Sequence, residues 1–325
     1  MGHILLIGAG FSRNWGGYLA NDFFDKLIGA KELDENCRNL LWQYKEEGFE
    51  KSLSVLQNEG GESLPLLEQA LRSVFQRMNT AFFDSTFSLE FIHGQNAQPN
   101  DNIKRFLARF DAIFTLNQDI LLESGYMAQS DPPQAFGHRW SDFSLPGMIP
   151  RVQPSPLSPL PRWCGEFCPD PQGVKPTSSV IQPIYKLHGS SNWVDEKGER
   201  LIIMGGEKTA KIGGSNVLAA YAEEFGRRLN EPEMRLKIIG YGFGDGHINA
   251  AIEAAATFGG LRTFIVDPRG SDAPNRKKAA INQISLPQPI NRTQASLIGA
   301  SRLSLREIFG GNRIERDDLL GFFAN

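Results

Sequence analysis

Several short segments that follow apolar runs carry residue types able to contact a nucleotide. The first is Gly8-Ala9-Gly10, directly after the run Ile4–Ile7. Glycine lets a backbone approach a phosphate closely, and a helix that follows points its N–H groups at the anion. Arg13 stands where the dinucleotide fingerprint has its third glycine, so a tight turn without a ligand fits the pattern equally well.

An amide, a carboxylate and a histidine follow later apolar runs. Asn117 and Asp119, in TLNQD, are two residues apart, so they share one side of an extended chain. Together they could hold a water, a ribose hydroxyl or a carboxamide, although both residue types are also common helix caps. His188, in KLHGS, is placed for general-base work near neutral pH, and a purely structural histidine is the alternative.

Two further segments complete the set. The run GYGFGDG, residues 240–246, could lie against a flat or anionic ligand, or could be only a flexible turn. Asp267, in Val266-Asp267-Pro268, could accept hydrogen bonds from a ribose hydroxyl. The set therefore contains glycines, an amide, two acids and a histidine. Nucleotide binding explains this combination better than separate structural roles do.

A parallel sheet is the element that would bring these segments together. Strands are predicted at 4–7, 112–116, 184–187, 201–204, 236–239 and 263–266, and helices at 217–229 and 247–258. Continuous apolar runs are typical of parallel strands buried on both faces, and ligands bind at the carboxyl ends of such strands. We therefore expect an α/β fold, a Rossmann-like doubly wound parallel sheet in a single domain spanning residues 1–325.

Insertions and a tail are expected around this sheet. A helical insertion is predicted at about 18–110 and a helical tail at about 296–325. Twelve of the nineteen prolines lie between Pro132 and Pro183, which predicts an irregular proline-rich insertion or lid at about 128–183.

Composition narrows the function classes. The 34 basic and 37 acidic residues give a net charge of −3, so no direct nucleic-acid binding is expected. The apolar run Ile4–Ile7 is too short for a membrane span or a signal-peptide core. Three cysteines cannot make a disulfide framework, which favours a reducing compartment. A cytoplasmic protein without membrane contact is expected.

The order of these motifs resembles the sirtuin superfamily, and more closely its branch in bacterial anti-phage defence, the sirtuin-like NADases. The corresponding segments read GAGFS, TLNQD, KLHGS, GYGFGD and VDP, and the resemblance, which includes the apolar run before the first segment, spans residues 4–268. The segments GFSRNWGG and GYGFGDGHIN look like the defence branch in particular.

The resemblance implies NAD⁺ as substrate, with Asn117 and His188 as catalytic residues. Asn117 would orient water and ribose, Asp119 would hold the nicotinamide carboxamide, and Asp267 would accept from the adenosine ribose. The full set of NAD⁺-binding residues that it implies is Gly8, Ala9, Gly10, Phe11, Ser12, Arg13, Asn117, Asp119, His188, Gly240, Tyr241 and Asp267.

The cysteines separate this chain from the deacylases of that superfamily. Deacylases carry four cysteines in a zinc ribbon, whereas this chain has only Cys37, Cys164 and Cys168. No zinc ribbon and no metal are therefore expected. The predicted activity is NAD⁺ glycohydrolysis, which releases nicotinamide and ADP-ribose. The alternatives are an NAD-dependent protein deacylase or ADP-ribosyltransferase, and a non-catalytic nucleotide-sensing or scaffold subunit.

The family also implies that such an activity is restrained until it is triggered. The expected role is an effector that depletes NAD⁺ in anti-phage defence. Activation would come from assembly into a homo-oligomer, from a partner such as a HerA-type ATPase or an Argonaute-linked module, or from a phage component.

Overall fold

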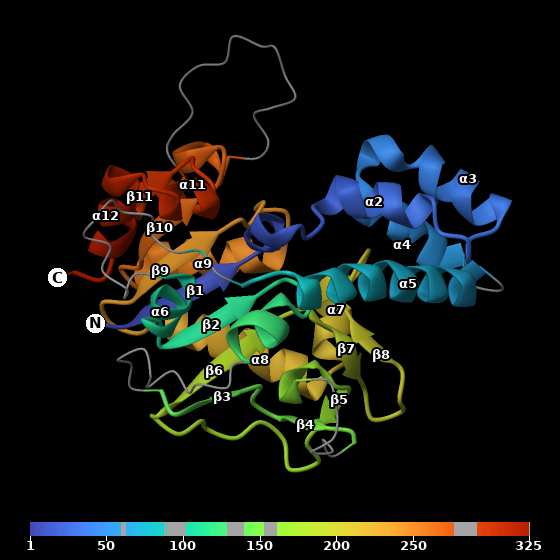
Figure 1. Cartoon of the computed structure of the whole chain (residues 1–325), viewed down its shortest axis with the longest axis horizontal. Helices are drawn as coiled ribbons and strands as arrows, with labels where there is room; N and C mark the ends of the chain where they lie inside the picture. Colours follow the sequence, from blue (N-terminus) through green and yellow to red (C-terminus); the bar gives the residue numbers. More distant parts are fainter. Residues whose placement is uncertain are drawn as a thin grey trace, which may run out of the picture.

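A seven-stranded parallel sheet forms the centre of the computed structural model (Figure 1), which describes residues 1–59, 63–87, 89, 102–128, 140–152, 161–275 and 291–324. All neighbouring strands in this sheet run parallel. In spatial order they are β11 (Leu297–Ser301), β10 (Arg262–Val266), β9 (Arg235–Ile239), β1 (His3–Ile7), β2 (Ala112–Thr115), β6 (Ile181–Lys186) and β3 (Asp142–Ser144).

Helices cover both faces of the sheet, because its central strands are apolar on both sides. On one face α8 (Asn216–Leu229) packs on β2 and β6, where the rings of Tyr185 and Tyr221 lie 5.0 Å apart. Beside α8 lies α9 (Gly246–Phe258). On the other face are α6 (Ile103–Ala108) and α12 (Arg313–Gly321). The chain thus has a Rossmann-like doubly wound α/β fold, as predicted.

A buried lysine lies on the second of these faces. Lys237, in the middle of β9, is fully buried and donates a hydrogen bond to the carbonyl of Leu319. Its ammonium lies 4.1 Å from the ring centre of Phe264 and 4.3 Å from that of Phe322. Burial lowers the pKa of Lys237 well below its usual value, and the nearby charge of Arg109 lowers it further.

Helices fill the described part of the predicted helical insertion, and Figure 1 shows four of them grouped beyond one end of the sheet. These four are α2 (Ala20–Ile28), α3 (Glu35–Gln43), α4 (Phe49–Glu59) and α5 (Ser63–Asp84). Phe23 of α2 packs α2 against two of the others, because its ring lies 5.5 Å from that of Phe49 in α4 and 4.9 Å from that of Phe75 in α5. Residues 60–62, 88 and 90–101 of the insertion lie outside the described residues.

The expectation of an irregular proline-rich insertion is wrong for its described part. Strand β3 joins the main sheet, and two more strands join a second, four-stranded sheet. That sheet consists of β4 (Met148–Pro150), β5 (Phe167–Pro169), β7 (Gly189–Val194) and β8 (Arg200–Ile202). The predicted strand at 201–204 therefore belongs to the second sheet, where β8 runs antiparallel to β7. Buried Trp163, Phe167 and Trp193 supply its core. Residues 129–139 and 153–160 lie outside the described residues.

The predicted helical tail also contains a strand. Before α11 (Leu305–Phe309) and α12, β11 extends the main sheet by pairing in parallel with β10. The burial along β11 is mixed, so the segment lacks the continuous apolar run from which strands were predicted. The remaining short helices are α1 (Ala9–Ser12), η1 (Arg13–Trp15), η2 (Lys45–Glu47), η3 (Leu122–Tyr126), η5 (Arg162–Cys164), α7 (Lys208–Gly213), η6 (Gly270–Asp272) and α10 (Arg292–Ala295).

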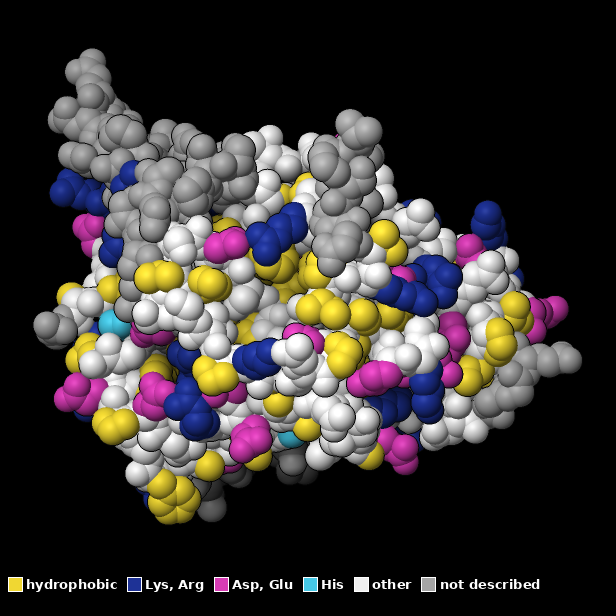
Figure 2. All heavy atoms as spheres, turned by 90° about the horizontal axis from the view of Figure 1, so that it is seen from below, with side chains coloured by type: hydrophobic (Ala, Val, Ile, Leu, Met, Phe, Trp, Pro, Cys, Tyr) yellow, Lys and Arg dark blue, Asp and Glu magenta, His cyan; other side chains and the backbone are white. Residues whose placement is uncertain are grey.

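Charges of both signs are mixed over the surface seen in Figure 2, where basic and acidic side chains alternate around apolar ones. This distribution agrees with the nearly balanced charge of the sequence. Among the described residues, no helix combines the length and the apolar character that crossing a membrane requires.

Candidate active site

A cavity of about 1110 Å³ opens at the carboxyl ends of the central strands. Gly8, Asn117 and Asp267, which follow β1, β2 and β10, all line it, as does His188 from the turn between β6 and β7. Crevices at this edge of a doubly wound sheet are where such folds bind nucleotides. Ten of the twelve residues expected to contact NAD⁺ line the cavity, and Phe11 and Ser12 do not.

The glycines of two loops pack directly against one another. The N–H of Gly10 donates to the carbonyl of Gly240 at 2.9 Å. A Cβ on Gly8 would lie 2.7 Å from the Gly240 oxygen, and one on Gly10 would lie 2.7 Å from the Gly240 Cα. Gly240 itself has a φ of +64°. The loop that follows β1 and the loop that follows β9 therefore approach so closely that these positions require glycine even without a ligand.

The side chain of Asn117 is held in one orientation by hydrogen bonds behind the cavity wall. Its Nδ2 donates to the carbonyl of Gly8 at 3.1 Å and to the hydroxyl of Ser12 at 2.9 Å. Both amide hydrogens are thereby used, so the side chain offers a ligand only its carbonyl oxygen. Ser12 is buried and supports Asn117 from behind, which explains why it does not line the cavity.

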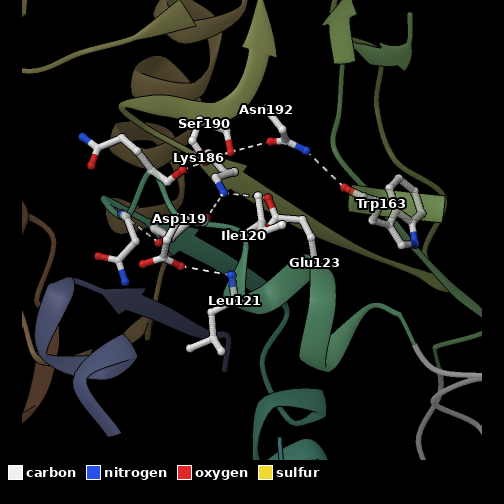
Figure 3. A network of polar contacts seen from close by, with 12 residues as sticks. Asp119, Ile120, Leu121, Glu123, Trp163, Lys186, Ser190 and Asn192 are labelled. Carbon is white, nitrogen blue, oxygen red and sulfur yellow. Dashed lines mark hydrogen bonds and ion pairs between the residues drawn. The ribbon is translucent and has the colours of Figure 1, made fainter. Parts of the chain in front are cut away.

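Asp119 lies beside this amide, and a buried ion pair supports its backbone. Its carboxylate accepts a hydrogen bond from the N–H of Leu121 at 3.0 Å, as a cap would. Burial raises the pKa of Asp119, opposed by the charge of Lys186 and by hydrogen bonds from Leu121 and Ser12. Figure 3 shows Lys186 reaching the carbonyl of Asp119 and the carboxylate of Glu123, 2.6 Å from its Nζ.

His188 follows β6, and among the titratable side chains that line the cavity it is the most deeply buried. Its side chain is 2% exposed, and burial lowers its pKa to about 4. Its Nε2 lies 3.2 Å from the Nε2 of His247, the second residue of α9. The imidazole of His188 is therefore neutral at pH 7, the form in which a histidine can accept a proton or bind a metal.

Residues that follow β9 and β10 form the part of the predicted site that would bind the adenosine of NAD⁺. Tyr241 is buried, and its hydroxyl donates to Asn249 at 2.8 Å, which ties the glycine-rich loop to α9. Asp267 lies in the cavity wall and accepts three hydrogen bonds from Arg269, from the backbone N–H at 2.9 Å, from Nε at 3.0 Å and from Nη2 at 3.4 Å. A ribose hydroxyl would therefore share this carboxylate with Arg269.

Phe11 occupies the core rather than the cavity. Its ring is fully buried and lies 5.2 Å from the ring of Trp15. Arg13, which was also predicted to contact NAD⁺, does line the cavity and forms an ion pair with Asp22 at 2.9 Å.

Sequence reasoning missed two parts of the cavity wall. One comes from the helical insertion, where Phe23, Phe49 and Met78 line the cavity. The other is the segment 302–307, which runs from the end of β11 into α11, and Arg306 of this segment donates to the carbonyl of Asn14. No local motif marks either segment, because each reaches the cavity only through the packing of the chain. The missed His247 had a visible signal, since it follows Asp245 by two residues in GDGH.

No protein-family model and no curated protein matches this chain. The function is therefore argued from the geometry of the cavity and from the motifs that line it.

Proposed function

We propose that the protein is an NAD⁺ glycohydrolase that releases nicotinamide and ADP-ribose. The observation that carries the proposal is the meeting of Asn117, Asp119 and His188 on one wall of a cavity that also contains the glycine loops and Asp267. These residues follow five strands, β1, β2, β6, β9 and β10, that are spread over the sequence. A cavity of about 1110 Å³ is slightly larger than the range of about 300–1,000 Å³ that is usual for small-molecule and cofactor sites.

The proposed reaction breaks the bond between the ribose C1′ and the nicotinamide nitrogen. The bonding electron pair leaves with nicotinamide, which becomes neutral, and C1′ acquires oxocarbenium character. A water oxygen then forms the new bond to C1′ and loses one proton. Because the leaving group starts as a cation, no acid is needed to protonate it. The protein has to hold the substrate, position the water and accept that proton.

The described contacts support one division of these tasks among the residues of the cavity. Asn117 has a fixed carbonyl oxygen that can accept a hydrogen bond from the water or from a ribose hydroxyl. Asp119 can accept one from the carboxamide N–H of nicotinamide. His188, neutral at pH 7 because its pKa is lowered to about 4, can take the proton from water directly or through the ribose. A neutral imidazole also avoids repulsion of the cationic nicotinamide ring.

Chromatography of NAD⁺ incubated with the purified full chain tests the proposal. The wild type should form nicotinamide and ADP-ribose in equal amounts, and Asn117→Ala or His188→Ala should lower kcat by about 100-fold or more. Asn192→Ala is the matched control, because the Nδ2 of Asn192, like that of Asn117, donates two hydrogen bonds, here to two backbone carbonyls, but Asn192 does not line the cavity. Normal turnover by both active-site variants, with folding verified by circular dichroism, would refute the assignment.

The biological part of the proposal rests on the family resemblance. We infer a cytoplasmic effector of anti-phage defence that depletes NAD⁺ after assembly or after contact with a partner such as a HerA-type ATPase. Turnover of NAD⁺ measured with and without the product of a neighbouring gene tests this part. NAD⁺ binding without turnover in either assay would favour a nucleotide-sensing subunit, and consumption of acyl-lysine peptide would favour a deacylase.

A further inference from the structure

Two histidines and an aspartate converge beside the cavity, and two of the three, His188 and Asp245, line it. His188 follows β6, whereas Asp245 and His247 stand at the start of α9, so the cluster joins two distant segments. The candidate ligand atoms of these three side chains all lie within 4.8 Å of one another. His188 is buried, and the other two are partly exposed.

The separation of the two imidazole nitrogens fits a single tetrahedral metal ion. Zinc binds histidine nitrogen at about 2.05 Å, so two such ligands at a tetrahedral angle lie about 3.3 Å apart. The two Nε2 atoms here are 3.2 Å apart. Imidazole and carboxylate together are ligands of zinc and similar transition ions, and three protein ligands leave a fourth position open.

Lys208 is the charged group that competes for this cluster. Its Nζ lies 2.6 Å from Oδ1 of Asp245 and 3.0 Å from Oε1 of Glu50. A carboxylate has two oxygens and about four lone pairs, so Asp245 can bind Lys208 and a metal ion at the same time. Glu50 provides a second anion for Lys208, which offsets the repulsion between the ammonium and a bound cation.

We propose that His188, Asp245 and His247 form a binding site for a zinc-type divalent ion that inhibits the enzyme. His188 and Asp245 both line the cavity, so the open position of the ion would face the substrate. A metal on Nε2 of His188 uses the lone pair that would otherwise be available to accept a proton. The inhibition rests on the proposed NAD⁺ hydrolysis, whereas the binding of the ion does not.

Titration of the chelator-treated full chain with ZnCl₂ tests the site, with CoCl₂ as a second, coloured probe. We expect one ion per chain and the visible absorption of tetrahedral cobalt. His247→Gln should weaken binding at least tenfold, because glutamine keeps a hydrogen-bond donor for His188 but removes a ligand nitrogen. Glu253→Ala is the matched control, since it removes an exposed carboxylate from the same helix. Equal affinity of the wild type and His247→Gln would overturn the site.

Nicotinamide release at increasing ZnCl₂ tests the inhibition, with each variant compared with its own metal-free rate. The wild type and Glu253→Ala should lose activity and recover it with chelator, whereas His247→Gln should need at least tenfold more zinc. Zinc that binds without slowing the reaction, or that accelerates it, would overturn the inhibitory role. A metal-free wild type that does not cleave NAD⁺ would refute the proposed function, and the inhibition with it. The titrations would still decide whether the ion site exists.

Discussion

Replacing Gly240 by alanine should damage the fold at the point where the site is assembled. The new methyl group would lie 2.3 Å from the nitrogen of Phe11 and 2.5 Å from the Cα of Gly10. These are backbone atoms, so no side chain can rotate away, and relief requires the β1 loop to move by about 1 Å to reach ordinary contact. The positive φ of residue 240 costs a non-glycine residue about 1–2 kcal/mol. Overpacking adds about 1–3 kcal/mol.

Loss of the hydrogen bond from Gly10 to Gly240 adds about 1 kcal/mol. The expected destabilisation of Gly240→Ala is therefore about 4 kcal/mol, measured as the free energy of unfolding in urea. Gly242→Ala is the control in the same loop, because a Cβ there meets no atom within 4 Å, and it should change stability by about 0.5 kcal/mol or less. If Gly240→Ala unfolds like the wild type, or if both variants are equally damaged, the packing explanation is wrong.

Three further substitutions test other parts of the structure. Lys237→Met should raise the free energy of unfolding by about 1–4 kcal/mol, because it removes a buried cation. The wild-type free energy of unfolding should also rise with pH between the lowered pKa of folded Lys237 and the pKa of about 10.4 in the unfolded chain, because the unfolded chain binds one more proton in that range. Urea titrations at several pH values should show that this rise is absent in Lys237→Met. Lys186→Met alone should cost about 3–5 kcal/mol by leaving Glu123 unpaired, and adding Glu123→Leu should recover much of that loss in the same assay. Asp267→Ala should raise KM for NAD⁺ about tenfold with little change in kcat, and an unchanged KM would remove Asp267 from the site.

The central strands were predictable because their burial is continuous. Strands β1, β2, β9 and β10 are buried on both faces, so their sequences are mostly apolar, with buried polar exceptions such as Lys237 in β9 and Thr263 in β10. The helices predicted at 217–229 and 247–258 correspond to α8 and α9 within one residue at their starts. Since parallel strands end at the same edge of a sheet, the joint position of Asn117 and His188 on the cavity wall followed from strand ends alone.

Apart from the strand predicted at 201–204, the second sheet was not predictable, because β4 and β5 are short and the strands that pair with them are distant in sequence. Strands β4 and β5 have three residues each and end in proline, so neither shows an alternating pattern. The contact between His188 and His247 was missed for a related reason. It depends on how α9 is placed relative to the turn after β6, and no spacing within either segment encodes that placement.

The contribution of segment 302–307 to the cavity wall has a consequence for synthesis of the protein. Translation delivers the chain from residue 1 onward, so the glycine loops, Asn117 and His188 all emerge before this wall segment does. Until residue 307 has left the ribosome, the nascent chain contains every proposed catalytic group but only part of the binding site. If the protein binds NAD⁺ as proposed, capture of the nucleotide would begin only after residues 302–307 had left the ribosome and packed onto the cavity.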